Sequence, residues 1–350
     1  MPRVSYDERV HSVSIAEVAQ RAGVSTATVS RALSGRGRVS AAAKEAVLAA
    51  ADALGYVVSS NASSLASGRT RNVGVVLPFL NRWYFASVLE GAQQALLRAG
   101  YDVTLYNLSG GGEERASVFE HFLLRQRVDA VIAVSLELTE DEVARLHALG
   151  KPIVGVGGPI PGVRTLAIDD VAVAKLATEH LTGLGHTRIG HLGGRAEFDS
   201  DFHLPVQRRH GYEAALDEAG IPFDADLVAN ADFTVQGGYH AAKQLLGAPP
   251  RSRPTAIFAA SDEMAIGAIL AARDLGLAVP HDVSVVGIDD HDQAEFFGLT
   301  TVAQFPRKQG ARAVDILLEQ LEPRDGSEPL ADILLSFELV VRSSTSRPRD

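Results

Sequence analysis

The side chains with the clearest chemical pattern lie between residues 25 and 31 of the 350-residue chain. This run, STATVSR, combines four hydroxyl groups with one guanidinium, and its remaining side chains are small. Hydroxyls both donate and accept hydrogen bonds, and a guanidinium donates several in a fixed geometry. Short side chains of this kind suit a helix that is pressed into the major groove of DNA. The run is therefore a candidate reader of nucleic acid.

No catalytic or metal-binding set accompanies this run. Cysteine is absent from the sequence, which excludes disulfides, cysteine-ligated zinc and a thiol nucleophile. The eleven histidines are scattered without the spacing of metal ligands, and no nucleophile–base arrangement or phosphate-binding glycine loop is found. We therefore expect a binding protein and not an enzyme, with no catalytic residues, no metal and no cofactor.

Three short helices are predicted to position the run, each preceded by a serine that can cap it. They are expected to cover residues 15–22, 26–33 and 41–54. Gly23 and Gly55 follow the first and the third helix, where a left-handed residue ends a helix well. Two short helices joined by a tight turn and braced by a third are typical of a helix-turn-helix. From the pattern alone, a three-helix bundle that binds nothing stays open as an alternative.

Charge points to nucleic acid at the N-terminal part alone. The whole chain has a net charge of −10. Residues 1–72 nevertheless contain nine Lys/Arg and five Asp/Glu residues, whereas the other 278 residues contain 24 basic and 38 acidic ones. A small basic head on a large acidic body is consistent with a polyanionic partner for the head only. Because many basic N-termini bind nothing, charge by itself is weak support.

The rest of the chain alternates between apolar runs and helical patterns. Six apolar runs are predicted to be buried strands, at residues 73–77, 130–134, 153–156, 188–192, 256–259 and 284–288. Helical patterns lie between them, at residues 85–99, 171–184, 207–219, 236–247 and 262–275. Alternating strands and helices predict doubly wound parallel sheets that bind ligands at the carboxyl ends of their strands. The length suits two lobes better than one sheet.

Several motifs, in this order, resemble the LacI/GalR family of bacterial repressors. In the head the resemblance runs through residues 13–19, 22–31, 39–40, 54–56 and 65–70. In the body it includes residues 182–189, 208–212, 261–267 and 286–290. The resemblance covers nearly the whole chain. It implies an all-α helix-turn-helix head followed by an α/β two-lobed core of the periplasmic-binding-protein fold.

The resemblance also implies how the chain is divided. The expected segments are a head at 1–58, a hinge helix and linker at 59–71, an effector-binding and dimerisation core at 72–342, and a C-terminal tail at 343–350. The chain should cross between the lobes near residues 169, 303 and 331. Because the C-terminal end lacks a leucine-heptad pattern, a homodimer is expected rather than a tetramer.

Within the head, the resemblance assigns contacts to double-stranded operator DNA. The residues expected to read base edges are Thr26, Ala27 and Arg31. The residues expected to contact mainly phosphates are Ser25, Thr28 and Ser30, and Ser14 joins the DNA-binding set. The regulator implied by these contacts binds a palindromic operator and represses transcription.

In the hinge, the resemblance implies a short helix that forms only on operator DNA. Residues 59–68 are rich in serine and too poor in helix formers to be helical unaided. Leu65 is expected to enter the minor groove, and Asn61 to contact DNA. Val58 and Ser59 stand where the family commonly has proline and asparagine, which is a departure at the start of the hinge helix.

Between the lobes, the resemblance implies a site for a small-molecule effector. Arg208 and Asp289 occupy positions at which a guanidinium and a carboxylate can bracket vicinal hydroxyls. Phe233 stands where an aromatic side chain packs on the ligand. Further lining residues are expected at Tyr84, Phe85, Ser261 and Gln304. Gly157 replaces an acidic cleft residue of the family. Surface ion pairs for the two charged residues and core packing for Phe233 are the alternatives.

The implied effector is a sugar or a sugar derivative, with a nucleoside as the second choice. A transport-type sugar-binding protein would share the body, but it should have an export signal and no head. An enzyme would need a cofactor fingerprint or a catalytic group. No stretch reaches the 18 or more apolar residues that span a bilayer, and the first twelve residues contain no apolar signal core. We therefore expect a cytoplasmic protein without a membrane partner.

Overall fold

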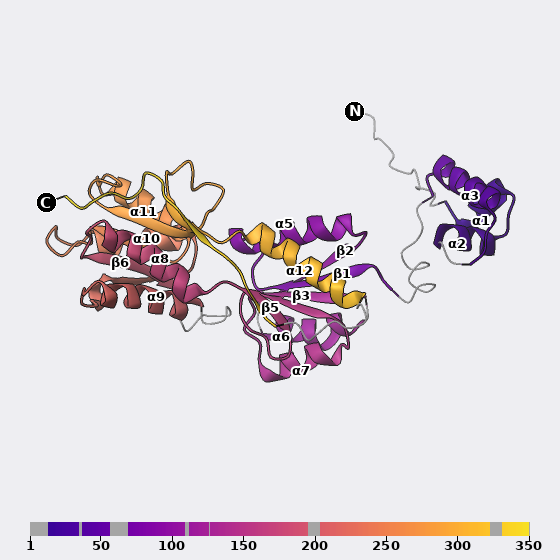
Figure 1. Ribbon diagram of the computed structural model, residues 1–350, viewed down its shortest axis with the longest axis horizontal. Coiled ribbons are helices and arrows are strands. Elements are labelled where there is room, and N and C mark those ends of the chain that lie inside the picture. The colour runs from indigo at the N-terminus through magenta and orange to yellow at the C-terminus, as the bar shows by residue number, and fades with distance from the viewer. Residues whose placement is uncertain are drawn as a thin grey trace, which may run out of the picture. The chain divides into compact units, whose positions relative to one another are not determined.

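The computed structural model in Figure 1 describes residues 13–34, 37–56, 69–108, 112–125, 127–194, 204–322 and 331–349. The chain divides into two compact units, residues 1–71 and residues 72–350. The predicted hinge contacts Asn61 and Leu65, together with Val58 and Ser59, lie outside the described residues. No helix within the described ranges is long and apolar enough to cross a membrane.

The head contains three helices at the predicted places. They are α1 (Ile15–Ala22), α2 (Thr26–Ser34) and α3 (Ala41–Leu54). The N–H of Glu17 donates to the Ser14 hydroxyl, and the Glu17 carboxylate accepts from the N–H of Ser14, so the predicted capping box is present. Gly23 and Gly55 end α1 and α3 in the left-handed conformation, with φ of 66° and 63°.

A single apolar cluster holds the head together. Val18, Val29 and Val47, one from each helix, are completely buried in it. Val13 packs against the same cluster, as a residue before the capping box is expected to do. Full burial of one such side chain contributes about 1.5–3 kcal/mol. The cluster fixes α2 against α1 and α3 through one face and leaves the opposite face of α2 free of core contacts.

Residues from 72 onward form two six-stranded sheets, as the two-lobed prediction requires. The first sheet has the order β11-β5-β4-β3-β1-β2 and the second the order β12-β10-β9-β8-β6-β7. The strands of the first are β1 (Asn72–Leu77), β2 (Asp102–Asn107), β3 (Ala130–Val134), β4 (Ile153–Val156), β5 (Arg164–Ala167) and β11 (Ile333–Leu334). The strands of the second are β6 (Ile189–Gly194), β7 (Val228–Ala231), β8 (Ala256–Ala259), β9 (Ser284–Asp289), β10 (Thr300–Ala303) and β12 (Glu338–Val340). Every pairing is parallel except that of β10 with β12.

Helices cover both faces of each sheet, as Figure 1 shows. Those of the first lobe are α5 (Trp83–Arg98), α6 (Gly112–Ser117), α7 (Glu140–Ala148) and α12 (Pro306–Leu321), with a short π-helix at Val118–Phe122 and a 3₁₀ helix at Leu123–Arg125. Those of the second are α8 (Asp170–Gly183), α9 (Leu204–Glu218), α10 (Val235–Leu246) and α11 (Asp262–Asp274), with a 3₁₀ helix at Ala225–Leu227. Successive strand residues alternate between the two faces, so Val75 packs towards α5 while Val76 packs towards Phe119 and Leu146. The fold is therefore doubly wound.

Helices α5 and α12, which are far apart in sequence, lie side by side in the first lobe. Glycines allow their close approach. A Cβ atom at Gly91 would lie 1.9 Å from the carbonyl oxygen of Arg307, and one at Gly310 would lie 2.0 Å from that of Val88. The backbones therefore touch directly, and this contact fixes the position of the first turn of α12, which follows a crossing between the lobes.

The chain crosses between the sheets three times, at residues 168–169, 304–305 and 335–337. The third crossing lies beyond the expected residue 331, because β11 still pairs with β5 of the first sheet. The separate C-terminal tail predicted at 343–350 is also wrong for its described part. Ser344 is buried, its carbonyl accepts from the N–H of Val285 at 2.8 Å, and its hydroxyl accepts from the N–H of Thr300 at 2.8 Å. These residues belong to the second lobe.

The core of the second lobe contains a buried histidine, His191 on β6. Its ring is stacked between Tyr212 and Phe258, with centroid distances of 5.0 Å to each. Burial lowers the pKa of His191 to about 4, because a charged imidazolium loses its hydration in this apolar position. The histidine is therefore neutral in the folded protein at neutral pH.

This histidine predicts an acid-dependent loss of stability. The unfolded chain takes up the proton near pH 6.5, whereas the folded chain takes it up only near pH 4. Above pH 6.5 the neutral ring makes its full contribution to the free energy of unfolding. This free energy falls by about 3 kcal/mol as the pH drops to about 4. Urea unfolding at pH 7, 6, 5 and 4 should show this loss in the wild type and not in His191→Gln. Because other groups titrate equally in both proteins, parallel pH profiles of the two would contradict the assignment.

Candidate functional site

The face of α2 that is turned away from the head core carries the predicted DNA-reading residues. Its exposed members are Thr26, Ala27, Ser30 and Arg31, and Thr28 is half-buried. The N–H of Thr28 donates to the Ser25 hydroxyl at 3.2 Å, so Ser25 caps α2. Nε of Arg31 donates to the carbonyl of Ala27 at 3.1 Å, which orients the guanidinium along the helix surface. A row of short polar groups with one oriented guanidinium is thus presented to the surroundings.

Ser14 uses its side chain for the local structure of the head. Its hydroxyl accepts from the N–H of Glu17 at 3.3 Å and donates to the Glu17 carboxylate at 2.8 Å. The hydroxyl of Ser25 also lies 3.0 Å from that of Thr28. Ser14 and Ser25 therefore cap the first turns of α1 and α2. A contact of either hydroxyl with a DNA phosphate would be a second function of the same side chain.

A cavity with room for about 140 Å³ lies between the two sheets of the core, and we call it the inter-lobe cavity. A single water needs roughly 10–15 Å³ on this scale, so the cavity accommodates an organic molecule. It is lined by all seven residues that the sequence placed there, namely Tyr84, Phe85, Arg208, Phe233, Ser261, Asp289 and Gln304. Gly157 lies on its wall as well.

The topology explains why these distant residues meet. Ser261 follows β8, Asp289 ends β9, and Gln304 follows β10. These parallel strands end at the same edge of the second sheet, where the loops leave a crevice. From the first lobe, Tyr84 and Phe85 reach the cavity from the first turn of α5, which follows β1.

Arg208 forms a buried ion pair, which the sequence did not predict. Its side chain is 4% exposed, and both Nε and Nη2 donate to Oδ1 of Asp170, at 2.9 and 2.8 Å. Nη1 donates to the carbonyl of Ala260. Burial raises the pKa of Asp170, and the charge of Arg208 opposes that rise. The alternative of a surface ion pair for Arg208 is wrong, because the pair forms part of the cavity wall.

A chain of hydrogen bonds orients Asp289 from the opposite side. The Tyr84 hydroxyl donates to Oε1 of Gln309 at 2.9 Å, and Nε2 of Gln309 donates to the carbonyl of Gln304 at 2.7 Å. Nε2 of Gln304 then donates to Oδ1 of Asp289. The chain begins in the first lobe and ends in the second, and all three groups after Tyr84 are buried. Asp289 also has a φ of 132°, a conformation that its surroundings must enforce.

The charges on the cavity wall favour a ligand that is not an anion. Burial raises the pKa of Asp289 to about 6. Burial, and then the charge of Asp289, raise the pKa of Glu263 to about 7. With Asp170, three carboxyl groups face two guanidiniums, those of Arg82 and Arg208, among the described lining residues. The guanidinium of Arg208 is already paired with Asp170, and the remaining carboxyl groups are suited to hydrogen bonds with hydroxyls.

Asp170 and Gln309 also line this wall, although the sequence alone did not predict them. Asp170 begins α8 directly after the first crossing, and it resembled an ordinary acidic residue at a helix start. Gln309 lies one turn into α12 directly after the second crossing. Both residues lie just after a crossing between the lobes, and this position could have indicated that they line the cavity. Among the described residues, no group of three or more His, Asp and Glu side chains could hold a metal ion.

Beside this cavity, three side chains form a polar contact between the lobes, which we call the inter-lobe contact (Trp83, Arg307 and Asp292). Nη1 and Nη2 of Arg307 donate to the two carboxylate oxygens of Asp292, at 3.1 and 2.9 Å. Nε1 of Trp83 donates to the same carboxylate at 3.0 Å. Trp83 and Arg307 belong to the first lobe, whereas Asp292 follows β9 of the second. Nε of Arg307 is held by Glu90 at 2.6 Å.

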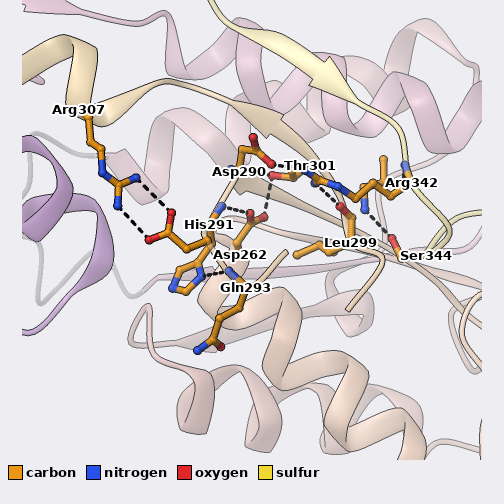
Figure 2. Close-up of polar contacts among 11 residues, drawn as sticks. Asp262, Asp290, His291, Gln293, Leu299, Thr301, Arg307, Arg342 and Ser344 are labelled. Atoms are coloured by element: carbon orange, nitrogen blue, oxygen red, sulfur yellow. Dashed lines mark hydrogen bonds and ion pairs between the residues drawn. The ribbon is translucent and has the colours of Figure 1, made fainter. Parts of the chain in front are cut away.

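The segment that carries Asp292 is anchored in the second lobe, as Figure 2 shows. The N–H of His291 and the hydroxyl of Thr301 donate to the buried Asp262, at 2.9 and 2.7 Å. Asp290 accepts from Arg342 at 2.6 Å. The cavity residue Asp289 and the inter-lobe contact are thus only three residues apart on one anchored segment. The cavity wall and the inter-lobe contact therefore share one short segment of the chain.

The inter-lobe contact predicts a fluorescence change that is easily measured, because Trp83 is the only tryptophan in the chain. Asp292→Ala should remove the partner of Nε1 and expose the indole, giving a red-shifted emission and stronger quenching by acrylamide. The unfolding free energy should change by less than about 1 kcal/mol, since this ion pair is partly exposed.

Asp315→Ala is the matched control. It removes an exposed ion pair with Arg312 on the same helix, α12, without any link to the second lobe. Its emission and quenching should equal those of the wild type. An equal change in both variants, or none in Asp292→Ala, would rule out the proposed coupling of Trp83 to the second lobe.

The chain is similar to known proteins over both of its parts. Residues 14–59 match the bacterial regulatory proteins of the lacI family, and residues 178–345 match a periplasmic binding protein-like domain. The HTH-type transcriptional regulator MalR of Streptomyces coelicolor is 38% identical over 346 residues, which cover 95% of this chain and 96% of that protein.

Two solved structures resemble the whole chain. The lac repressor dimer bound to operator and the anti-inducer ONPF is 28% identical, with a TM-score of 0.82, and the match covers 95% of this chain and 99% of that one. The complex of the transcriptional regulator CelR with cellobiose is 32% identical, with a TM-score of 0.69 and the same coverage. The match to known regulators of transcription thus extends over head and core together, and this chain belongs to the lacI family of bacterial DNA-binding regulators.

Proposed function

We propose that this protein represses transcription as a homodimer whose affinity for operator DNA is controlled by a small polyhydroxy effector in the inter-lobe cavity. The observation that carries the proposal is the cavity itself. It is closed by polar groups from both lobes, and it lies in a chain whose N-terminal helix face is built of hydroxyls and a guanidinium. Since operator DNA is the partner, the protein acts in the cytoplasm.

The head supplies the DNA contacts in this proposal. Thr26, Ala27 and Arg31 read base edges in the major groove, while the hydroxyls of α2 position the helix on phosphates. Two heads of a dimer reach successive major grooves on one side of a palindromic operator. The lac repressor, bound to its operator as a dimer, supports this arrangement. Leu65 enters the minor groove, and Asn61 adds a further contact with the DNA.

A neutral sugar is the effector that the inter-lobe cavity suits best. Carboxylate, amide and hydroxyl groups of Asp289, Gln304 and Ser261 can accept hydrogen bonds from sugar hydroxyls or donate to them. Phe233 and Tyr84 offer apolar ring faces for the C–H side of a pyranose. The pairing of Arg208 with Asp170 disfavours a sugar phosphate, because this guanidinium already has its counter-charge. CelR, which is similar over its whole length, was solved with cellobiose.

Control follows from the placement of the site between the lobes. A ligand that contacts both lobes stabilises one relative orientation of them, and it can shift DNA affinity only by its preference for that orientation. Asp289 contacts the ligand, and Asp292 on the same segment holds α5 and α12. The change in orientation is passed to the start of the core at β1, from which the hinge leads to the head.

The first test concerns the effector. A thermal-shift screen of sugars, sugar phosphates and nucleosides identifies a ligand, and calorimetry then measures its affinity. Asp289→Ala should bind the ligand about 5- to 150-fold more weakly, because the loss of one buried partner costs about 1–3 kcal/mol. DNA binding without the ligand should be unchanged.

Asp217→Ala, an exposed acidic residue on α9, is the control and should behave as the wild type. Wild-type affinity in Asp289→Ala would place the effector elsewhere. A sugar phosphate that binds more tightly than its parent sugar would contradict the charge argument for a neutral ligand.

The second test concerns the head. An operator is first selected from random duplexes with the wild-type protein. Arg31→Ala should lose about 5- to 150-fold in affinity for that operator, as expected for one contact to a base worth about 1–3 kcal/mol. Its binding to unrelated DNA, which depends mainly on phosphate contacts and salt, should change much less.

Fluorescence anisotropy with both duplexes provides the measurement. Arg98→Ala removes the same charge from an exposed position in the core and should leave both affinities unchanged. Because Arg31 is exposed, the head should stay folded without it. If Arg31→Ala selected the same operator with the same affinity, the proposed orientation of α2 on DNA would be wrong.

A further inference from the structure

A second cavity lies at the opposite end of the sheet in the second lobe, and we call it the distal cavity. It has room for about 310 Å³, more than the 140 Å³ of the inter-lobe cavity. Two of its lining residues, Arg188 and Thr255, directly precede β6 and β8, and a third, Asp282, lies two residues before β9. The distal cavity is thus built at the amino ends of the parallel strands, whereas the inter-lobe cavity is built at their carboxyl ends. Strands of four to six residues separate the two by roughly 13–20 Å.

The distal cavity is basic although the body of the protein is acidic. Arg188, Arg253 and Arg349 line it. Asp282 is the one carboxylate among the described lining residues, and it is already paired with Arg349 at 2.9 Å. Within the part of the chain that the structure describes, no carboxylate lies within ion-pairing distance of Arg188 or Arg253. The exposed Arg188 and the half-buried Arg253 thus offer positive charge to an anion that enters the cavity from solvent.

Backbone carbonyls orient both of these guanidiniums. Nε of Arg188 donates to the carbonyl of Arg253 at 3.0 Å, and Nε of Arg253 donates to the carbonyl of Ala248 at 3.3 Å. Each side chain is therefore fixed through Nε, which leaves the terminal nitrogens for an outside partner. A guanidinium that is held in this way recognises phosphate or carboxylate oxygens through two parallel hydrogen bonds.

The walls around the arginines are rigid and partly apolar. Pro250, Pro254, Pro280 and Pro348 line the cavity together with Leu277. Proline rings have a fixed φ, so the wall loses little freedom when a ligand binds. A free phosphate ion would form hydrogen bonds with the arginines but would make no contact with this apolar wall. The combination of anchored guanidiniums with an apolar wall fits a ligand that has both a phosphate and an organic part.

We propose that the distal cavity binds a small phosphorylated metabolite, whose phosphate is held by Arg188 and Arg253. The ligand differs in charge from the neutral effector of the inter-lobe cavity. The lobe that senses the effector would thereby carry a second sensor, at the other end of the same strands.

The test uses the full-length protein with glucose 6-phosphate, inorganic phosphate and glucose, all at constant ionic strength set with chloride. Glucose 6-phosphate should raise the melting temperature in a saturable manner, and calorimetry should show tighter binding than for inorganic phosphate. Arg188→Gln/Arg253→Gln should bind it at least tenfold more weakly. Arg251→Gln, an exposed neighbour outside the cavity lining, should bind it as the wild type does.

Two further variants keep the result interpretable. Arg188→Lys/Arg253→Lys retains the charge and should recover part of the affinity, which a merely unfolded double variant could not do; circular dichroism checks the fold of each. Unchanged binding in the glutamine variant, or a loss in Arg208→Gln instead, would place the anion elsewhere and overturn the proposal. Equal affinity for glucose 6-phosphate and inorganic phosphate would overturn the role of the apolar wall. An effect no larger than that of chloride would show a non-specific ion only.

Discussion

The hydrogen-bond chain from Tyr84 through Gln309 and Gln304 to Asp289 is the constraint on which the sensing core depends. It starts on a helix of the first lobe, passes the second crossing of the chain, and ends on a strand of the second lobe. Because its inner members are buried, each broken bond would leave an unsatisfied polar group, at a cost of about 1–3 kcal/mol. The same bonds therefore connect the two lobes and orient the ligand-facing carboxylate.

The buried pair of Arg208 with Asp170 has the complementary role. It holds the guanidinium of Arg208 on the cavity wall, where the side chain is buried and its charge is balanced by Asp170. Such a pair adds little stability of its own, because desolvation offsets most of the attraction. What it provides is position, since the geometry of two donors to one carboxylate oxygen is narrow. A cavity that must distinguish hydroxyl patterns benefits from groups that cannot rearrange.

The segment after β9 connects this wall to the rest of the molecule. Asp289 faces the cavity, and Asp292 holds helices α5 and α12 of the first lobe through Trp83 and Arg307. Asp262 and Arg342 fix the segment to the second lobe from behind. Burial, and then the charge of Asp289, raise the pKa of Asp262 well above its usual range. The same lobe carries the distal cavity at the amino ends of its strands, so its sheet separates two chemically different sites.

The sequence by itself determined those features that depend on neighbouring residues. Caps at Ser14 and Gly23 set helix bounds, and continuous apolar runs marked buried parallel strands, because both signals are local. The resemblance to a repressor family also implied seven side chains that line one cavity. Only the tertiary structure decided which side chains pair. Trp83 and Asp292 are 209 residues apart, and Arg208 is 38 residues from Asp170. The third crossing and the last residues were misplaced for the same reason: edge-strand pairing and side-chain contacts are set by packing between segments that no local pattern links.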